Sequence, residues 1–367
     1  MKESAKDLRY MTRALELARE KEGLTRPNPP VGAVVVKNGR VVGEGAHPKA
    51  GQPHAEPLAL KQAGKRAVGA TLYVTLEPCS SSGRTPPCCE AILAAGVSRV
   101  VVGCVDPNPV HAGGGLTLLR KAGLQVDCGI AQDACEALIA PFACRQVRGM
   151  PQVVVKLGMT LDARIADHRG TSQWITGPEA RKRVQEMRRS SDAILVGSGT
   201  ARKDDPSLLP RPARGRKPLR VVLDAGLTLP RTRQIFTDGK ARQTLVVCGD
   251  DVSEQAVRKL EATGASVLPL PLNRAGQLPL RRLLKALGQR DVMRVWCEGG
   301  GVLAGALIDQ GLADEVWSFV APVFLGGDKA AFSLKQKALG RVDRWRFLAP
   351  ELVGEDVLLR AVRKEKG

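Results

Sequence analysis

Aromatic side chains are scarce in this chain of 367 residues, of which Phe, Tyr and Trp make up 3%. Proteins that hold single-stranded nucleic acid use aromatic rings as platforms on which bases stack, so the shortage argues against that role. No stretch approaches the ~20 consecutive apolar residues that a membrane helix needs. The charged start, Met1-Lys2-Glu3-Ser4, is not that of a secretory signal. We therefore expect a cytoplasmic protein with no membrane segment and no nucleic-acid partner.

Acidic residues are too few to balance the basic ones. The chain has 56 Lys and Arg against 37 Asp and Glu, for a net charge of +19. Such a charge is typical of proteins that bind nucleic acid, and it keeps an RNA-binding protein open as an alternative. The excess is spread out, however, with local clusters only at 181–189 and 211–220. A small substrate that carries a phosphate fits this distribution better.

Paired cysteines are missing too. The nine cysteines are an odd number, and most stand singly along the chain. This pattern is typical of reduced thiols and excludes a disulfide framework as the basis of the fold. Repeats and low-complexity segments are also absent, whereas a hydrophobic content of 43% is sufficient for buried cores. The length favours two domains.

The most informative residues are His54, Glu56, Cys79 and Cys88. One imidazole and two thiolates can hold Zn²⁺ and leave a fourth tetrahedral position open for water, which distinguishes a catalytic zinc from a structural one. Glu56 follows the histidine by two residues and can act on that water without binding the metal. The His-x-Glu and Pro-Cys pattern is that of zinc-dependent base deaminases. We therefore predict hydrolytic deamination, with Glu56 as the proton shuttle.

The apolar pattern around these residues predicts that they converge. A helix is expected from His54 to Gly64, a strand over 71–76, and a second helix after Cys88 that ends at Gly96. Ligands at two helix starts beside one strand can meet, and a helix N-terminus favours a thiolate. An alternative remains open, because Cys89 is adjacent and would make the zinc structural if it were a fourth ligand. Residues 80–87 separate the two cysteines, unlike the C-x-x-C of nucleic-acid deaminases.

Strand and helix patterns alternate in both halves of the chain, which predicts two α/β domains. In the first half, a hairpin is expected about Asn38-Gly39, a strong turn dipeptide. A polar stretch with Gly and Pro at 145–151 marks the boundary, so we place the domains at 1–147 and 148–367. The strands expected in the second half lie at 153–157, 193–196, 220–223, 244–247, 294–296 and 315–320.

Two glycine-rich loops in the second half indicate a nucleotide cofactor. Residues 197–200 follow a buried strand, but Arg202 stands where a dinucleotide fingerprint has its third glycine. Residues 298–301, Glu-Gly-Gly-Gly, lie between a strand and a helix, where backbone N–H groups can approach a phosphate. A plain strand-to-helix connection is the alternative for each loop taken alone.

Many motifs in one order then identify a family resemblance. They include Pro-Asn-Pro-Pro-Val-Gly at 27–32, Pro-His-Ala-Glu at 53–56, Gly-Arg-Thr-Pro-Pro-Cys at 83–88, Asp-Pro-Asn-Pro at 106–109, Ser-Gln-Trp-Ile-Thr-Gly at 172–177 and Glu-Gly-Gly at 298–300. Over nearly its whole length the chain resembles the bifunctional riboflavin-biosynthesis deaminase/reductases. The resemblance implies a cytidine-deaminase-like α/β/α domain followed by a dihydrofolate-reductase-like α/β domain.

The resemblance also implies the chemistry. The substrate would be 2,5-diamino-6-ribosylamino-4(3H)-pyrimidinone 5′-phosphate, which loses its 2-amino group as ammonia before NADPH reduces its ribosyl group to ribityl. Zinc would be held by His54, Cys79 and Cys88, with Glu56 as the catalytic residue. NADPH would contact Gly158, Trp174, Thr200, Asp204, Gly300, Gly301, Val302, Leu303 and Ala304. The substrate would contact Asn28, Ser172, Arg188, Leu208, Arg211 and Glu298, where an arginine can clamp the phosphate.

The chain departs from the family pattern at two notable positions. Ser81 stands two residues after the first zinc cysteine, where the family usually has histidine, and Ala163 stands where glycine is usual. No zinc ligand is lost, so we expect both activities; a reductase with a merely structural zinc domain is the alternative. The resemblance further implies a homodimer or a higher homo-oligomer.

Overall fold

The computed structural model describes residues 5–81, 86–212, 217–336, 338 and 342–364. Residues 83–85 of the family motif and 213–216 of the second basic cluster therefore lie outside the described residues. The chain divides into two compact units, Met1–Gly149 and Met150–Gly367. The boundary placed at 147/148 falls in the last turn of helix α5 (Gln132–Arg148). In the described part of the chain, no helix combines the length and apolar character needed to cross a membrane.

The first unit is built on a five-stranded sheet in the order β2-β1-β3-β4-β5. Strand β1 is antiparallel to both β2 and β3, whereas β3, β4 and β5 run parallel. The hairpin predicted at Asn38-Gly39 is confirmed, since Lys37 pairs with Arg40. The strands are β1 (Gly32–Lys37), β2 (Arg40–Ala46), β3 (Thr71–Leu76), β4 (Arg99–Cys104) and β5 (Gln125–Cys128).

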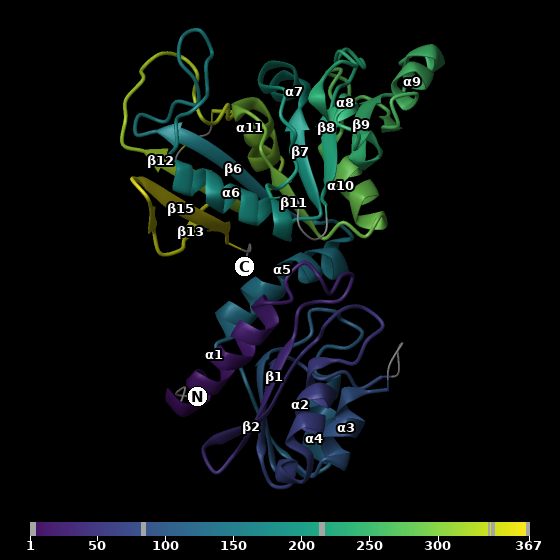
Figure 1. The fold of residues 1–367 in the computed structure, drawn as a ribbon, viewed down its shortest axis with the longest axis vertical. Coiled ribbons are helices and arrows are strands. Elements are labelled where there is room, and N and C mark those ends of the chain that lie inside the picture. The colour runs from purple at the N-terminus through teal and green to yellow at the C-terminus, as the bar shows by residue number, and fades with distance from the viewer. Residues whose placement is uncertain (1–4, 82–85, 213–216, 337, 339–341, 365–367) are drawn as a thin grey trace. The chain divides into compact units, whose positions relative to one another are not determined.

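Helices cover both faces of this sheet, as Figure 1 shows. The inward side chains of α2, α3 and α4 form one core against one face. Those of α1 and α5 form another against the opposite face, which gives the predicted α/β/α layers. The helices are α1 (Ala5–Arg19), α2 (Ala55–Ala63), α3 (Cys88–Ala94), α4 (Gly114–Lys121) and α5, with a short 3-10 turn η1 (Gly64–Ala67) after α2.

Glycines in β2 fix the position of α2, and thereby of the predicted zinc histidine. A Cβ on Gly45 would lie 2.3 Å from the carbonyl oxygen of Ala55, and one on Gly43 would lie 2.2 Å from that of Ala59. The helix therefore packs directly on the strand backbone, an approach that only glycine permits. His54 immediately precedes this helix, as its N-cap residue.

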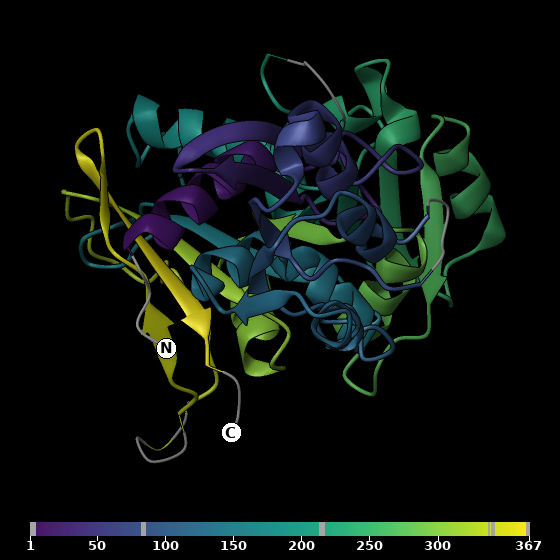
Figure 2. The ribbon, with the colours of Figure 1, turned by 90° about the horizontal axis from the view of Figure 1, so that it is seen from below.

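The second unit is built on a ten-stranded sheet in the order β10-β9-β8-β7-β11-β6-β12-β15-β13, with β14 paired to β15. The strands from β10 to β12 in this order are parallel, and β15 is antiparallel to β12. Figure 2 shows the C-terminal strands in yellow at one edge. The strands are β6 (Gln152–Thr160), β7 (Ala193–Gly197), β8 (Leu219–Leu223), β9 (Thr244–Gly249), β10 (Ser266–Leu270), β11 (Arg294–Cys297), β12 (Glu315–Ala321), β13 (Trp345–Phe347), β14 (Glu351–Val353) and β15 (Asp356–Arg363).

Two apolar cores also enclose this second sheet. Helices α10 and α11 pack on one face, and α6, α7, α8 and α9 pack on the other. The helices are α6 (Pro178–Ser190), α7 (Ser198–Asp204), α8 (Gln234–Thr237), α9 (Glu254–Glu261), α10 (Leu280–Gln289) and α11 (Gly301–Asp309), with a 3-10 turn η2 (Ala241–Gln243). Both predicted glycine-rich loops connect a parallel strand to a helix, at the strands' carboxyl ends, where α/β sheets bind ligands.

Ala163 adopts a left-handed backbone conformation. Its φ is 58°, in the turn where Ala163 donates its N–H to the carbonyl oxygen of Thr160. Glycine reaches this region without the steric cost that a Cβ imposes. The alanine at this position is therefore accommodated at some cost in backbone strain.

Candidate active sites

The three predicted zinc ligands lie together in the first unit. The ligand atoms of His54, Cys79 and Cys88 are all within 4.8 Å of one another. The His54 Nδ1 lies 3.2 Å from the Cys88 Sγ and 3.7 Å from the Cys79 Sγ. Such separations suit three atoms that share one Zn²⁺ at ~2.0–2.3 Å each. The arrangement arises because α2 and α3 both begin at this end of the sheet, beside the segment that follows β3.

Hydrogen bonds between the two cysteines shift the pKa values of their thiols in opposite directions. The Cys79 thiol accepts hydrogen bonds from Cys88, including one of 3.3 Å from its backbone N–H, and this lowers the pKa of Cys79 to about 4. The same contact raises the pKa of Cys88. Zinc binds thiolates, so metal binding at this pair would release the remaining thiol proton.

Glu56 is positioned for proton transfer at this cluster. It is buried in the first turn of α2, and burial raises its pKa to about 7. Its Oε2 has no hydrogen-bond partner among the described residues. A buried carboxylate oxygen without a partner is costly, so the site fits a polar group such as a metal-bound water. A carboxyl group with a pKa near neutrality can both accept and release a proton.

Cys89 is turned away from the ligand cluster. Its sulfur lies 3.6 Å from the carbonyl oxygen of Pro78 and 3.9 Å from that of Gly115, and burial raises its pKa to about 12. Among the described residues, the group able to hold a metal consists of His54, Cys79 and Cys88. A fourth protein ligand from Cys89, the basis of the structural-zinc alternative, is therefore not supported.

Asn28 is connected to the candidate zinc cluster by a second histidine, His47, which contacts both Asn28 and the ring of His54. Its Nδ2 is 3.0 Å from the Nε2 of His47, and the Nδ1 of His47 is 3.0 Å from the carbonyl oxygen of Pro53. The rings of His47 and His54 meet edge to face at 5.2 Å. Burial lowers the pKa of His47, which favours its neutral form. His47 was not among the site residues predicted from the sequence.

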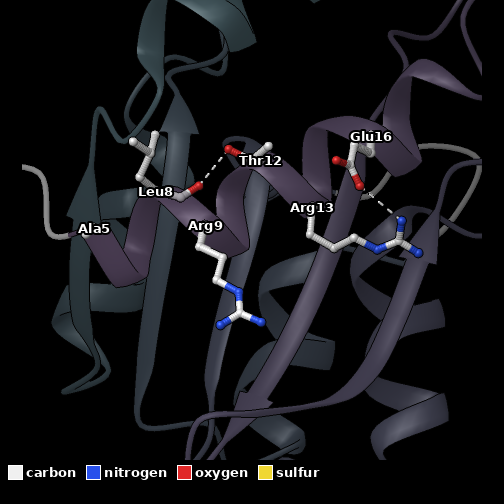
Figure 3. A pocket seen from close by; sticks show the side chains of 6 residues that line it. All are labelled: Ala5, Leu8, Arg9, Thr12, Arg13 and Glu16. Atoms are coloured by element: carbon white, nitrogen blue, oxygen red, sulfur yellow. Dashed lines mark hydrogen bonds and ion pairs between the residues drawn. The ribbon is translucent and has the colours of Figure 1, made fainter.

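A surface depression over α1 carries no comparable chemistry. Figure 3 shows its lining, with the Thr12 hydroxyl donating to the carbonyl oxygen of Leu8 and Arg13 paired with Glu16. Arg13 also pairs with Glu44. The polar groups of Thr12, Arg13 and Glu16 are therefore satisfied locally, and the guanidinium of Arg9 lies 5.9 Å from the centre of the Tyr10 ring.

The second unit contains a cavity of about 1520 Å³ at the carboxyl ends of its parallel strands. Its walls include the ends of β6, β7 and β8, one face of α6 and the loop before α11. The predicted residues that line it are Gly158, Ser172, Trp174, Arg188, Thr200, Asp204, Leu208, Arg211, Glu298, Gly300, Gly301, Val302 and Leu303. Ala304 is fully buried in the core instead, and its N–H donates to the carbonyl oxygen of Gly300.

Glycines leave open space in this cavity. A Cβ on Gly197 or Gly199 would meet no atom within 4 Å, and one on Gly300 would approach only the Thr200 hydroxyl, at 4.0 Å. The backbone at Gly300 has φ −69°, which any residue adopts. Neither packing nor conformation therefore requires glycine at Gly300. A ligand that approaches the backbone closely, such as a phosphate at a helix N-terminus, would explain the vacant volume.

Arg188 and Glu298 form a buried ion pair in the cavity wall. The Nε and Nη2 of Arg188 donate to the two carboxylate oxygens of Glu298, at 2.6 and 2.7 Å. The indole N–H of Trp296 donates to the same carboxylate at 3.0 Å. Burial opposes ionisation of Glu298, but Arg188 and Lys156 outweigh it and lower its pKa. The bidentate side of Arg188 is thus directed at Glu298.

Lys156 is a cavity residue that sequence reasoning left without a role. It lies in β6 with its Nζ 5.8 Å from the centre of the Phe319 ring, and burial lowers its pKa. A charged residue directly after three buried valines is the signal that could have identified it. Trp174, in contrast, is 69% exposed at the cavity mouth, with the Arg181 guanidinium 4.7 Å from its ring centre.

Comparisons with known proteins match the first unit to a deaminase family and the second to the RibD C-terminal domain. The family model of the cytidine and deoxycytidylate deaminase zinc-binding region matches residues 4–104, and that of the RibD C-terminal domain matches residues 151–359. The riboflavin biosynthesis protein RibD of Escherichia coli is 41% identical over 96% of this chain and 98% of its own length. That of Bacillus amyloliquefaciens is 40% identical over 97% and 96%.

Solved structures give the same result. RibD of Acinetobacter baumannii superposes with a TM-score of 0.84 at 39% identity, over 98% of this chain and 99% of that one. A diaminohydroxyphosphoribosylaminopyrimidine deaminase/5-amino-6-(5-phosphoribosylamino)uracil reductase of Thermotoga maritima has the same score at 34% identity, with the same coverage. Both similarities extend over the two units.

Proposed function

The chain belongs to the RibD family of bifunctional riboflavin-biosynthesis deaminase/reductases, and on this basis we propose which residues carry its two reactions. The substrate is 2,5-diamino-6-ribosylamino-4(3H)-pyrimidinone 5′-phosphate. The first unit replaces its 2-amino group by oxygen, and the second reduces its ribosyl group to ribityl. The ligand cluster beside a buried Glu56 with an unpartnered oxygen is the observation that carries the assignment of the deaminase.

In the deaminase, His54, Cys79 and Cys88 hold the zinc and Glu56 moves the protons. Zinc lowers the pKa of a bound water to ~7 and so supplies hydroxide at neutral pH. Glu56 would carry the two protons of the attacking water in turn, passing the first to the ring nitrogen and the second to the departing amine, so that ammonia leaves and the oxygen stays on the ring. Its burial, which raises its pKa to about 7, suits it to both directions of transfer. Asn28 is the proposed substrate contact in this unit.

In the reductase, the cavity orients NADPH and the ribosyl end of the substrate. NADPH supplies the hydride, which is the cofactor's own chemistry. The proposed cofactor contacts are Gly158, Trp174, Thr200 and Asp204 together with residues 300–303. Ser172, Leu208, Arg211 and the Arg188–Glu298 pair form the proposed substrate surface. Reduction also consumes one proton, and Lys156, which is half-buried and whose pKa is lowered by desolvation, lines the same cavity and can hold that proton.

Arg211 is the proposed phosphate contact. The guanidinium of Arg188 is directed at Glu298. Arg211 also lines the cavity, and its local hydrogen bonds are made by its backbone. Its N–H donates to Gln185 Oε1 and its carbonyl oxygen accepts from Arg189. Its guanidinium can therefore bind a phosphate through two parallel hydrogen bonds.

Alanine at Gly300 and alanine at Gly301 are expected to affect different properties, cofactor binding in the first case and stability in the second. At Gly300 the added methyl group enters open cavity space, so the fold is kept, but NADPH binding weakens because overpacking costs ~1–3 kcal/mol, or roughly 5- to 150-fold. At Gly301 the methyl group lies 2.7 Å from the carbonyl oxygen of Ala330, so stability itself falls by ~1–3 kcal/mol. Fluorescence titration with NADPH and urea unfolding separate the two effects. Wild-type NADPH affinity in Gly300→Ala would remove Gly300 from the cofactor contacts.

Removal of zinc tests the order of the two reactions. After chelation, NADPH oxidation is expected to stop when the diamino substrate is supplied, because the deaminated intermediate that the second unit reduces is no longer formed. It is expected to continue when the deaminated intermediate is supplied directly, because the cavity uses no zinc ligand. Oxidation of NADPH on the diamino substrate by the zinc-free protein would contradict this order. Readdition of Zn²⁺ is the control for irreversible damage.

We also propose that copies of the chain associate as a homodimer or a higher homo-oligomer. The second unit exposes apolar side chains that association would cover, among them Phe324 at 73% and Phe347 at 67%. Sedimentation equilibrium measures the state directly, and a monomer at all concentrations would overturn the proposal.

A further inference from the structure

A histidine that the zinc cluster does not use lies beside the segment that carries one of the ligands. The Nδ1 of His111 is 3.5 Å from the hydroxyl oxygen of Ser81, and Ser81 follows the ligand Cys79 by two residues. His111 comes from the connection between β4 and α4, and its side chain is half-buried. Residues distant in the sequence thus bring a further imidazole, besides those of His54 and His47, next to the segment that carries Cys79.

Glu77 fixes the connection that carries His111. Its carboxylate accepts hydrogen bonds of 3.1 and 2.9 Å from the backbone N–H groups of Asp106 and Gly113, and of 2.9 and 3.2 Å from those of Gly115 and Leu116. Since Glu77 lies two residues before Cys79, these bonds tie the connection to the ligand segment.

Close packing reinforces the attachment. A Cβ on Gly115 would lie 2.0 Å from the carbonyl oxygen of Pro78, and one on Gly114 would lie 3.1 Å from the Ser80 hydroxyl. Within the connection, the N–H of His111 donates to the carbonyl oxygen of Asn108 at 2.9 Å. The backbone of His111 is therefore held at a defined place against residues 77–81.

The contact with Ser81 leaves one ring nitrogen available. A serine hydroxyl both donates and accepts, so it satisfies the Nδ1 in either tautomer. The Nε2 of His111 has no hydrogen-bond partner in the described ranges. It is consequently free to donate to a ligand while Ser81 holds the ring.

We propose that His111 is a substrate-binding residue of the deaminase, with its Nε2 donating a hydrogen bond to an oxygen of the substrate and Ser81 holding its ring at Nδ1. The inference rests on the zinc site proposed above. Among the substrate's acceptors, the carbonyl oxygen of the pyrimidinone ring and the phosphate oxygens carry the most negative charge and are the strongest candidates. Both accept hydrogen bonds from an imidazole N–H.

The test compares deamination kinetics of His111→Ala with those of the wild type. Loss of one hydrogen bond to substrate is expected to raise KM for ammonia release about tenfold. Zinc content and NADPH-dependent reduction of the deaminated intermediate are expected to stay unchanged. The exposed His168 in the second unit provides the matched control, as His168→Ala. Wild-type ammonia release without zinc would refute the zinc site itself, whereas an unchanged KM in His111→Ala would refute only this inference.

A rescue variant distinguishes binding from a purely structural role. Because the Ser81 hydroxyl and the His111 ring lie 3.5 Å apart, an imidazole at position 81 can reach the space that His111 vacates. Adding Ser81→His to His111→Ala is therefore expected to lower the raised KM most of the way back to the wild-type value. Failure of the rescue, or loss of zinc from His111→Ala, would overturn the proposal.

The dephosphorylated substrate identifies the oxygen that is bound. If the penalty of His111→Ala vanishes with this substrate, His111 binds the phosphate; if the penalty persists, His111 binds the ring carbonyl. An equal KM for His111→Ala and wild type with both substrates would contradict binding altogether.

Discussion

Ammonia release is expected to fall by at least ~10²-fold when Glu56 is replaced by Gln, because proton transfer by a positioned side chain contributes ~10²–10⁴-fold. The amide keeps the size of the carboxyl group, so zinc binding and packing around α2 are preserved. It cannot take the proton from the zinc-bound water, however, and it cannot return one to the departing amine. The assay measures ammonia from the diamino substrate, with zinc content determined on the same sample.

Reduction of the deaminated intermediate by Glu56→Gln is expected to proceed at the wild-type rate, since the cavity that we assign to NADPH lies in the second unit. Glu90 on α3, exposed and close in sequence to Cys88, provides the control, and Glu90→Gln should retain both activities. Ammonia release at the wild-type rate by Glu56→Gln would exclude Glu56 as the proton shuttle. Loss of both activities would instead show that the two units depend on one another.

Replacing Arg188 by Met is expected to have the largest effect on the second unit. It leaves the carboxylate of Glu298 buried without its partner, and breaking a buried ion pair in this way costs ~3–5 kcal/mol. Both members of the pair line the cavity, so reductase activity should be lost as well. Urea unfolding measures the first effect and NADPH oxidation the second, while ammonia release should persist in conditions where the first unit stays folded.

The neighbouring pair of Arg183 and Glu351 provides a matched comparison. Arg183 lies on the same helix and its 2.8 Å ion pair is far more exposed, so Arg183→Met should cost no more than ~1 kcal/mol. Adding Glu298→Leu to Arg188→Met removes the unpaired charge and should recover stability without recovering reduction. Equal losses of stability for Arg183→Met and Arg188→Met would contradict the role given to burial.

The candidate zinc site could be predicted from the sequence because its residues belong to short local motifs. His54 and Glu56 are two residues apart at a helix start, and Cys79 and Cys88 follow one strand and precede one helix. The two-domain α/β class could also be predicted from the sequence, since strand and helix patterns alternate in both halves of the chain. The comparisons and the structure confirm that class.

The reductase cavity was harder to predict from the sequence because its chemistry depends on residues that are far apart in the chain. Arg188 and Glu298 are separated by 110 positions, and no local pattern indicates that they pair. The contact between Ser81 and His111 is of the same kind, as is the role of Glu77, which bonds to backbone that any sequence would provide. Ala304, the last of the predicted cofactor residues, lies on α11 with its side chain buried in the core, because a glycine-loop motif extended along a helix soon includes buried residues.

We propose above all that the first unit is a catalyst in its own right rather than a structural zinc module. The direct measurement is ammonia release from the diamino substrate by purified protein of known zinc content, with NADPH omitted. We predict rapid release of one ammonia per substrate molecule, followed by NADPH oxidation only when the cofactor is added. Zinc-loaded protein that releases no ammonia would contradict the claim and leave a reductase alone.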